Sequence, residues 1–462
     1  MKKIAKSTRD KLNKNIRGVL ALFVTLFAAI IVYLGYSVIS FGDEWSQTPY
    51  NPRIQKVIKN MTEGSIYDIN GERLAWSADE DSPRSYIDSA TNRRVMSHVL
   101  GDTHGMSVGA ESVFTSYLYG IKDGSAEAGA RKGNDITLTV DTDLSRFIYD
   151  NFAGKQGSAV VMNYKTGEIL ANVSLPAFDP ITVAEDKLED GALLDRAVMG
   201  RFPPGSIMKV VTASAAVEED IDITYTCKGQ DIIDGQKVTC VSAHGTQNLE
   251  QAFENSCNCY FARLSNEIGS QKLLATANRF GFNVDWDFDD IVLYESNFEL
   301  SSSEGDIAWA GIGQYNDLIT PMHACMIAGT IANDGNMMVP KLLYKAVNEN
   351  GRQTYQMQEE TYSNVLEAET TQTIKEYMKN VVKSGTGTSA GVSGMDIGGK
   401  TGTAEYVDKD TGKVKNHSWF IGFIDDEDKP YCVAVIFEGA GFGSKYAAPM
   451  AGKIFSYINQ NY

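Results

Sequence analysis

Ser206 and Lys209 lie three residues apart at the start of an expected helix. The segment 201–218, RFPPGSIMKVVTASAAVE, begins with Pro-Pro-Gly and continues with helical spacing. Residues three apart on a helix share one face, so the two side chains are neighbours. A serine hydroxyl becomes an effective nucleophile when a base takes its proton, and a neutral lysine amine can be that base. The pair therefore predicts serine acyl-transfer chemistry, provided that burial or a second cation lowers the pKa of the lysine.

Two further motifs follow this pair along the chain. ENSCNCYF contains Ser256-Cys257-Asn258, and MDIGGKTGTAEY contains Lys400-Thr401-Gly402-Thr403. Ser-x-x-Lys, Ser-x-Asn and Lys-Thr-Gly in this order are the motif set of penicillin-binding proteins and serine β-lactamases. Another Lys-Thr-Gly, Lys165-Thr166-Gly167, precedes the serine, lies in an expected hairpin turn and lacks the following threonine. We assign that copy a structural role.

Over nearly its whole length, the chain resembles the transpeptidases of the class B penicillin-binding proteins. Its compact size is similar to the penicillin-binding protein A subgroup. The resemblance is carried by GSAVVMNYKTGEILANVSLPAFDP, DRAVMGRFPPGSIMKVVTA, GIGQYNDLITPMHACMIAGTIANDG, GGKTGTAEY and HSWFIGF. Nearer the N-terminus, NPR and GSIYDINGERLA resemble the pedestal module of the same family.

The resemblance implies a catalytic role for four side chains. Ser206 would attack the carbonyl of the penultimate D-alanine in a D-Ala-D-Ala stem peptide, with Lys209 as general base. Ser256, beside Lys400, would relay a proton to the departing amine. The backbone N–H groups of Ser206 and Thr403 would hold the oxyanion. The acyl group would then pass to an amine of a neighbouring peptidoglycan stem peptide, and β-lactam antibiotics would acylate the same serine.

The resemblance also implies substrate-binding residues. Asn258 would bind the peptide amide, and Thr401-Gly402-Thr403 would hold the terminal carboxylate through its two threonine hydroxyls. Lys400 would add positive potential and, as a like charge, keep Lys209 neutral. A D,D-carboxypeptidase or β-lactamase of the same fold is one alternative function, but we identify no glutamate placed to hold a deacylating water. A non-catalytic penicillin-binding scaffold or sensor is another, but the serine and both lysines are present.

The N-terminal end predicts a membrane anchor. Residues 1–17 carry one acidic and seven basic residues, and the apolar run 18–38 would form a helix of about 31 Å. Basic residues before the span place the N-terminus in the cytoplasm and the catalytic domain outside the bacterial cell membrane. A cleaved signal peptide is the alternative, but the apolar run is longer than a usual signal core and no clear cleavage site follows it.

Four regions are expected along the chain: a basic tail (1–17), a single transmembrane helix (18–38), a small pedestal module (39–134) and a transpeptidase domain (135–462). In the pedestal, of mainly β or α+β type, apolar residues around Asn70-Gly71 predict a hairpin and 109–120 predicts a helix. In the larger domain, strands predicted near both ends surround a helical middle. Together with the resemblance, they predict an α/β fold with a central antiparallel sheet flanked by helices.

The six cysteines include no C-x-x-C pair, and the five histidines include no H-E-x-x-H motif. We therefore expect neither a metal nor another cofactor. Cys227 and Cys240 flank KGQDIIDGQKVT, whose Asp-Gly predicts a hairpin that would bring them together. They are either a disulfide outside the membrane or two small buried thiols, and His244 has no apparent catalytic partner.

The overall charge and the domain sizes restrict the partners. With 59 acidic and 42 basic residues the formal charge is −17, which argues against nucleic acid. A glycosyltransferase domain does not fit into the pedestal region, so glycan polymerisation must come from another protein. The resemblance implies a multi-span glycosyltransferase of the shape, elongation, division and sporulation (SEDS) family as that partner.

Overall fold

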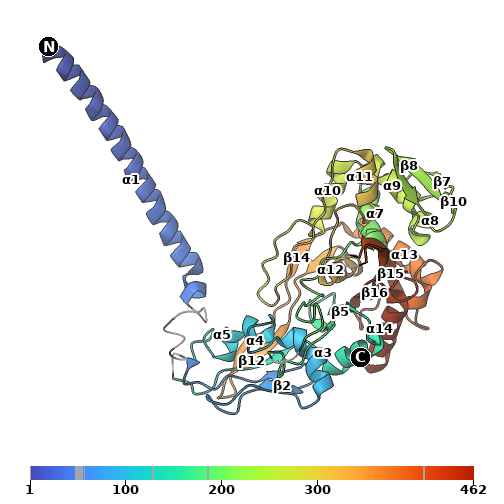
Figure 1. Ribbon diagram of the computed structural model, residues 1–462, viewed down its shortest axis with the longest axis horizontal. Coiled ribbons are helices and arrows are strands. Elements are labelled where there is room, and N and C mark those ends of the chain that lie inside the picture. Colours follow the sequence, from blue (N-terminus) through green and yellow to red (C-terminus); the bar gives the residue numbers. More distant parts are fainter. Residues whose placement is uncertain are drawn as a thin grey trace.

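The computed structural model describes residues 2–46, 52, 56, 58–126, 129–184, 187–408 and 411–462. Helix α1 (Lys2–Ser46) stands apart from the rest of the chain as a single long rod (Figure 1). Its segment Lys11–Gly42 is long and apolar enough to cross a membrane, and none of its most apolar stretch is buried against the protein. The predicted helix over 18–38 is confirmed and suggests a membrane anchor. Asn51 and Arg53, of the predicted NPR segment, lie outside the described residues.

The N-terminal module is built on a six-stranded sheet in the order β13-β12-β4-β1-β2-β3. The turn at Asn70-Gly71 joins β1 to β2, which pair antiparallel, so the predicted hairpin is confirmed. Two strands of this sheet, β12 and β13, come from the C-terminal half of the chain. The strands are β1 (Ile66–Tyr67), β2 (Arg73–Trp76), β3 (Ser85–Tyr86), β4 (Asp135–Leu138), β12 (Leu343–Val347) and β13 (Gln353–Gln356).

Three helices accompany this sheet: α3 (Ala90–Leu100), α4 (Ala110–Val113) and α5 (Thr115–Leu118). The single helix predicted over 109–120 is wrong in detail, because the region forms two short helices. Phe114 separates them with φ −99° and ψ 19°, which departs from regular α-helical geometry. The ring of Phe114 is buried in the core, so its side chain stays packed at the point where the helix is interrupted.

The larger domain is built on a five-stranded antiparallel sheet in the order β15-β16-β17-β5-β6. Its strands come from both ends of the domain, as predicted. The decoy Lys165-Thr166-Gly167 lies in the β5–β6 turn, where Gly167 has φ +84°, and its structural placement is confirmed. The strands are β5 (Gly157–Asn163), β6 (Ile169–Leu175), β15 (Ile397–Val407), β16 (Val414–Ile424) and β17 (Tyr431–Phe437).

Both faces of this sheet are covered by helices. Along β5, Val160 and Met162 belong to one apolar cluster, whereas Ala159 and Val161 belong to another. This alternation follows from the two-residue period of a strand and gives each face its own core. The helix α12 (Pro321–Ala332) packs on one face, and α6 (Thr142–Phe152) and α14 (Ala447–Asn461) pack on the other.

The remaining elements pack beside the edge strand β15, on α12 or on one another. Two small two-stranded sheets and the helices α8 and α9 lie at the end of the molecule opposite the N-terminal module (Figure 1). Strands β8 (Gln230–Ile233) and β9 (Gln236–Thr239) pair across Asp234-Gly235, which confirms the predicted hairpin. The others are the short helix η1 (Gly205–Met208), α7 (Lys209–Glu218), β7 (Tyr225–Cys227), β10 (Gly245–Gln247), α8 (Leu249–Glu254), α9 (Asn258–Ile268), α10 (Ser270–Arg279), α11 (Glu304–Ala310), β11 (Asn336–Met338), β14 (Thr361–Asn364), α13 (Ala368–Lys383) and η2 (Thr388–Ala390).

Candidate active site

Ser206 lies in the one-turn helix η1, directly before α7 begins at Lys209. The preceding Gly205 has φ +55°, and its N–H donates to the carbonyl of Gly313 at 2.7 Å. A Cβ atom on Gly313 would lie 1.9 Å from the Gly205 carbonyl oxygen, and one on Gly205 would lie 2.5 Å from that of Thr403. Glycine is therefore required at both positions. The close backbone contacts hold the serine turn against β15.

Lys209 is fully buried and is held by the segment that contains Ser256 and Asn258. Its Nζ lies 2.7 Å from the Ser256 carbonyl oxygen, 2.7 Å from Asn258 Oδ1 and 3.3 Å from Ser256 Oγ. Burial lowers the pKa of Lys209 to about 8. Among the hydrogen bonds of the described residues, none joins Ser206 Oγ to this amine. The site therefore positions the amine through its other partners.

Ser256 lies between the two buried lysines. Its hydroxyl accepts from Lys400 Nζ at 2.9 Å, and Lys400 also donates to the Thr401 carbonyl at 3.1 Å. Ser256 has φ +53°, a left-handed conformation that is costly for a residue with a side chain. Strained backbone of this kind concentrates at functional sites. The site thus places one hydroxyl within hydrogen-bonding distance of two amines.

The two buried lysines affect each other's protonation. Burial, and then the charge of Lys209, lower the pKa of Lys400 well below its usual value. The lowered pKa of Lys209 has burial as its cause. Repulsion between two like charges is mutual, so a charged Lys400 would also disfavour the protonated form of Lys209.

The strand β15 presents Thr401, Gly402 and Thr403 beside the serine turn. The hydroxyl of Thr401 lies 2.6 Å from that of Thr386, and Thr403 Oγ1 accepts from the N–H of Gly443 at 3.3 Å. A Cβ atom on Gly402 would lie 2.8 Å from Trp419 Cβ and 3.0 Å from Ile207 Cγ2, so the strand packs closely here.

Sequence reasoning did not find Thr386, Gly443 or Thr239. Thr386 lies in SGTGT (384–388), whose Gly and Thr content predicts only a loop. The carbonyl of Thr239 accepts from Asn258 Nδ2 at 2.8 Å, so both ends of the Asn258 amide have partners within the protein. These contacts join segments far apart in the chain, and no local pattern marks them.

Cys227 and Cys240 are brought together by the β8–β9 hairpin. Their sulfur atoms lie 3.8 Å apart, and both cysteines are free. Cys240 Sγ also lies 3.8 Å from Cys257 Sγ and 3.5 Å from Cys259 Sγ. The hairpin thus gathers four sulfur atoms next to the Ser256–Asn258 segment.

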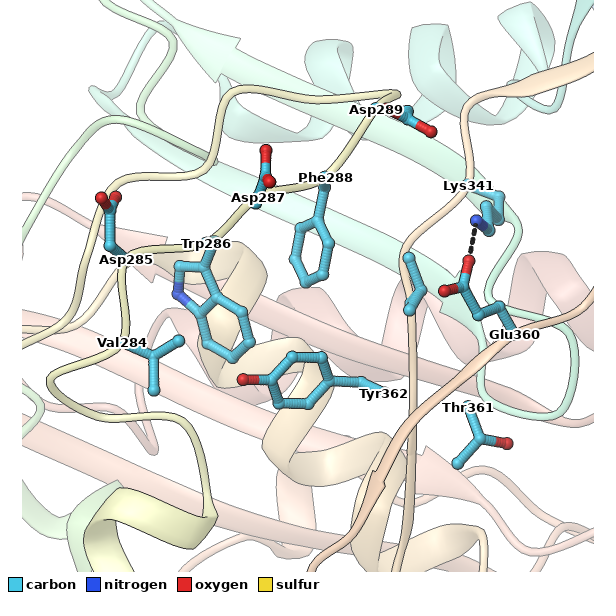
Figure 2. A pocket seen from close by; sticks show the side chains of 11 residues that line it. Val284, Asp285, Trp286, Asp287, Phe288, Asp289, Lys341, Glu360, Thr361 and Tyr362 are labelled. Atoms are coloured by element: carbon cyan, nitrogen blue, oxygen red, sulfur yellow. Dashed lines mark hydrogen bonds and ion pairs between the residues drawn. The ribbon is translucent and has the colours of Figure 1, made fainter. Parts of the chain in front are cut away.

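Figure 2 shows a pocket of about 360 Å³ that none of the predicted site residues lines. Its apolar wall is aromatic: the rings of Trp286 and Phe288 stack at 5.2 Å, and Tyr362 lies 5.0 Å from Trp286. On another side of the pocket, Lys341 Nζ forms an ion pair with Glu360 Oε2 at 2.6 Å. The pocket lies outside the cluster of motif residues, so it adds no group to the catalytic geometry.

A serine on a constrained turn, two buried lysines of lowered pKa and a second serine between them define an enzyme class: serine acyl-transferases that use lysine as the base. Residues 157–456 match the family described as the penicillin binding protein transpeptidase domain. The chain therefore belongs to this family. It is a serine D,D-transpeptidase, and its N-terminal module and anchor helix fit the compact class B type.

Individual relatives agree with this assignment. The chain is 25% identical to the peptidoglycan D,D-transpeptidase PbpA of Mycolicibacterium smegmatis, over 95% of this chain and 97% of that one. A solved D,D-transpeptidase domain of a peptidoglycan glycosyltransferase from Eggerthella lenta is 29% identical with a TM-score of 0.76, covering 87% of this chain and 99% of that one. Penicillin-binding protein A of M. tuberculosis, solved as a penicillin G acyl-enzyme complex, shares the fold at 23% identity, with a TM-score of 0.75 and coverage of 87% and 99%.

Proposed function

We propose that Ser206 is the nucleophile of a peptidoglycan D,D-transpeptidase and that Lys209 is its general base. The observation that carries this proposal is the convergence of both buried lysines on Ser256, beside the glycine-clamped turn of Ser206. A neutral amine has two N–H groups, and the 2.7 Å contacts to Ser256 O and Asn258 Oδ1 use both. The lone pair of Lys209 then remains for the Ser206 proton.

The reaction proceeds through an acyl-enzyme on the donor peptide. Ser206 Oγ bonds to the carbonyl carbon of the penultimate D-alanine while Lys209 takes the hydroxyl proton. The C–N bond to the terminal D-alanine then breaks, and its amine receives a proton relayed through Ser256, which Lys400 contacts at 2.9 Å. An amine of a second stem peptide attacks the ester carbonyl and gives up a proton to Lys209. The C–O bond to Ser206 breaks, the serine oxygen regains a proton, and the cross-link is released.

The strand β15 binds the donor in this proposal. The backbone N–H groups of Ser206 and Thr403 hold the oxyanion, each contributing about 3 kcal/mol by analogy with other acyl-transfer sites. The hydroxyls of Thr401 and Thr403 hold the terminal carboxylate across Gly402. Asn258 binds the peptide amide through the second N–H of its side chain, since the first donates to the Thr239 carbonyl. A bound carboxylate would raise the pKa of Lys400, because an opposite charge favours the protonated amine.

Benzylpenicillin tests this function on the full chain in detergent. We expect intact mass spectrometry after brief exposure to show one drug molecule per chain, held as a stable ester and mapped by peptide analysis to 202–218. The ester persists because no glutamate-held water is expected to hydrolyse it. Drug consumption without a lasting adduct would instead support a β-lactamase or carboxypeptidase, and no reaction at all would support the scaffold alternative.

The acylation rate should rise with pH through the pKa of Lys209. Only the neutral amine can accept the Ser206 proton, and its pKa is about 8. The rate constant for benzylpenicillin should therefore increase about tenfold from pH 6 to 7, and level off above about pH 9. Stopped-flow or quenched mass spectrometry over this range measures the profile. A flat profile between pH 6 and 9 would remove Lys209 from the role of titrating base.

The chain is also proposed to act as a single-pass membrane protein beside a separate glycan polymerase. The seven basic residues ahead of the apolar helix support a cytoplasmic N-terminus and an extracytoplasmic catalytic domain. The partner is a SEDS-family glycosyltransferase that contacts α1 and the N-terminal module. Cross-linking in native membranes followed by purification should recover such a polymerase, and its absence would contradict this partner.

A further inference from the structure

Four side chains outside the catalytic set meet beside the Ser256–Asn258 segment. Cys227 ends β7, Cys240 follows β9, His244 precedes β10 and Cys257 precedes α9. One potential ligand atom from each lies within 4.8 Å of all the others. We infer that these four residues form a structural site for one Zn²⁺ ion.

The spacing of the sulfur atoms fits a tetrahedral metal site. Zn–S bonds are about 2.3 Å long, so two sulfurs on one tetrahedral zinc lie about 3.8 Å apart. The Cys227–Cys240 and Cys240–Cys257 separations are both 3.8 Å. A disulfide would need its two sulfurs at about 2.05 Å and would engage only two of the three. Three cysteines with one histidine are an established ligand set for structural zinc.

The surroundings of the sulfurs also suit metal-bound thiolates. The N–H of Gly229 points to Cys227 Sγ at 3.4 Å, and the N–H of Cys259 points to Cys240 Sγ at 3.4 Å. Backbone N–H donors stabilise negative sulfur and orient it towards a metal. The buried Nδ1 of His244 has no hydrogen-bond partner among the described residues, so a ring nitrogen there is available as the fourth ligand.

Cys259 is close to the cluster but is not assigned as a ligand. Its thiol points to the Val238 carbonyl at 3.7 Å, within the hairpin. It therefore supplies a matched control, because it is a buried cysteine of the same region. The ligand pattern escaped the sequence analysis because 12 residues separate Cys227 from Cys240 and another 12 separate His244 from Cys257. Only the hairpin turn brings them together.

A metal here would fix the catalytic segment to the hairpin. Cys257 lies between Ser256 and Asn258, and Asn258 donates to the carbonyl of Thr239, the neighbour of Cys240. Zinc would therefore position both residues that contact Lys209. These ligands are positioning residues, and loss of the metal should slow acylation by benzylpenicillin about tenfold or more.

The metal itself is measured without reference to catalysis. The full chain in detergent is reduced, supplied with Zn²⁺, freed of excess metal and analysed by inductively coupled plasma mass spectrometry. We expect about one zinc per chain, and after replacement by Co²⁺ the intense visible bands of a tetrahedral thiolate site. Cys240→Ser and His244→Ala should lose most of the bound zinc, whereas Cys259→Ser should retain it.

Two results would overturn this inference, and neither depends on the folding of a variant. One is a native chain with six titratable thiols that retains no zinc and gives no tetrahedral cobalt spectrum. The other is a native chain whose intact mass and peptide map show a Cys227–Cys240 disulfide. Because both readouts measure metal or thiols, the outcome is separate from whether Ser206 is the nucleophile.

Discussion

Replacing Ser206 by alanine is expected to slow acylation by benzylpenicillin by a factor on the order of 10⁴ or more. The variant removes the oxygen that forms the ester, and loss of the nucleophile in other serine acyl-transfer enzymes has effects of this size. The turn should keep its shape, because Gly205 and Gly313 set its backbone through contacts that do not involve the serine side chain. The rate constant is measured by intact mass spectrometry at several times and drug concentrations.

Ser214→Ala is the matched control for this variant. Ser214 is a buried serine of α7, the helix that follows the Ser206 turn, and its hydroxyl donates to the Val210 carbonyl at 2.8 Å, away from the motif residues. Its loss should leave the acylation rate within a factor of about two, because it removes a single hydrogen bond within the helix. A stable adduct on the Ser206→Ala chain would show that another residue is the nucleophile.

Replacing Lys400 by methionine should lower the acylation rate about 10²- to 10³-fold. The change removes the donor that contacts Ser256 Oγ at 2.9 Å and the positive charge available to a substrate carboxylate. Methionine has a similar length, and burial already disfavours the charged amine, so the fold should tolerate an apolar side chain there. Circular dichroism and thermal melting check folding, and quenched mass spectrometry gives the rate.

The chain provides an internal control in its other Lys-Thr-Gly. Lys165 lies in the β5–β6 turn, with its amine 5.8 Å from the ring of Tyr164. Lys165→Met should acylate at the native rate, because this lysine lies outside the catalytic cluster. Equal rates for Lys400→Met and the native chain would remove Lys400 from the proposed catalytic set.

The strands of the central sheet could be predicted from the sequence, because each strand is marked by the residue pattern of its own short segment. Segments such as SAVVMN and YCVAVIFEG are short, apolar and bounded by turns, and the structure places them in β5 and β17. The hairpins at Asn70-Gly71 and Asp234-Gly235 have turn residues that suit few other conformations. Strong local preference thus agreed with the final fold at these positions.

Features that depend on distant pairs were not predicted. Nothing in LYKAV shows that β12 joins the sheet of the N-terminal module, because that pairing to β4 crosses about half the chain. The same holds for Thr386 beside Thr401 and for the gathering of Cys227, Cys240 and Cys257. The motifs identified the chemistry of the site, whereas its supporting contacts required the three-dimensional arrangement.

The mixed origin of the N-terminal sheet has a mechanical consequence. Strand β4 lies at the predicted boundary between the two regions, and β12 and β13 follow shortly after α12, which covers the catalytic sheet. Cutting the chain near residue 134 would separate β4 from its neighbour β1. The β1–β2 hairpin would then lose the strand that pairs with β1 on its inner side. The two regions therefore share the strands of one sheet. A force applied to the anchor helix would be transmitted through these strands to the domain that carries Ser206.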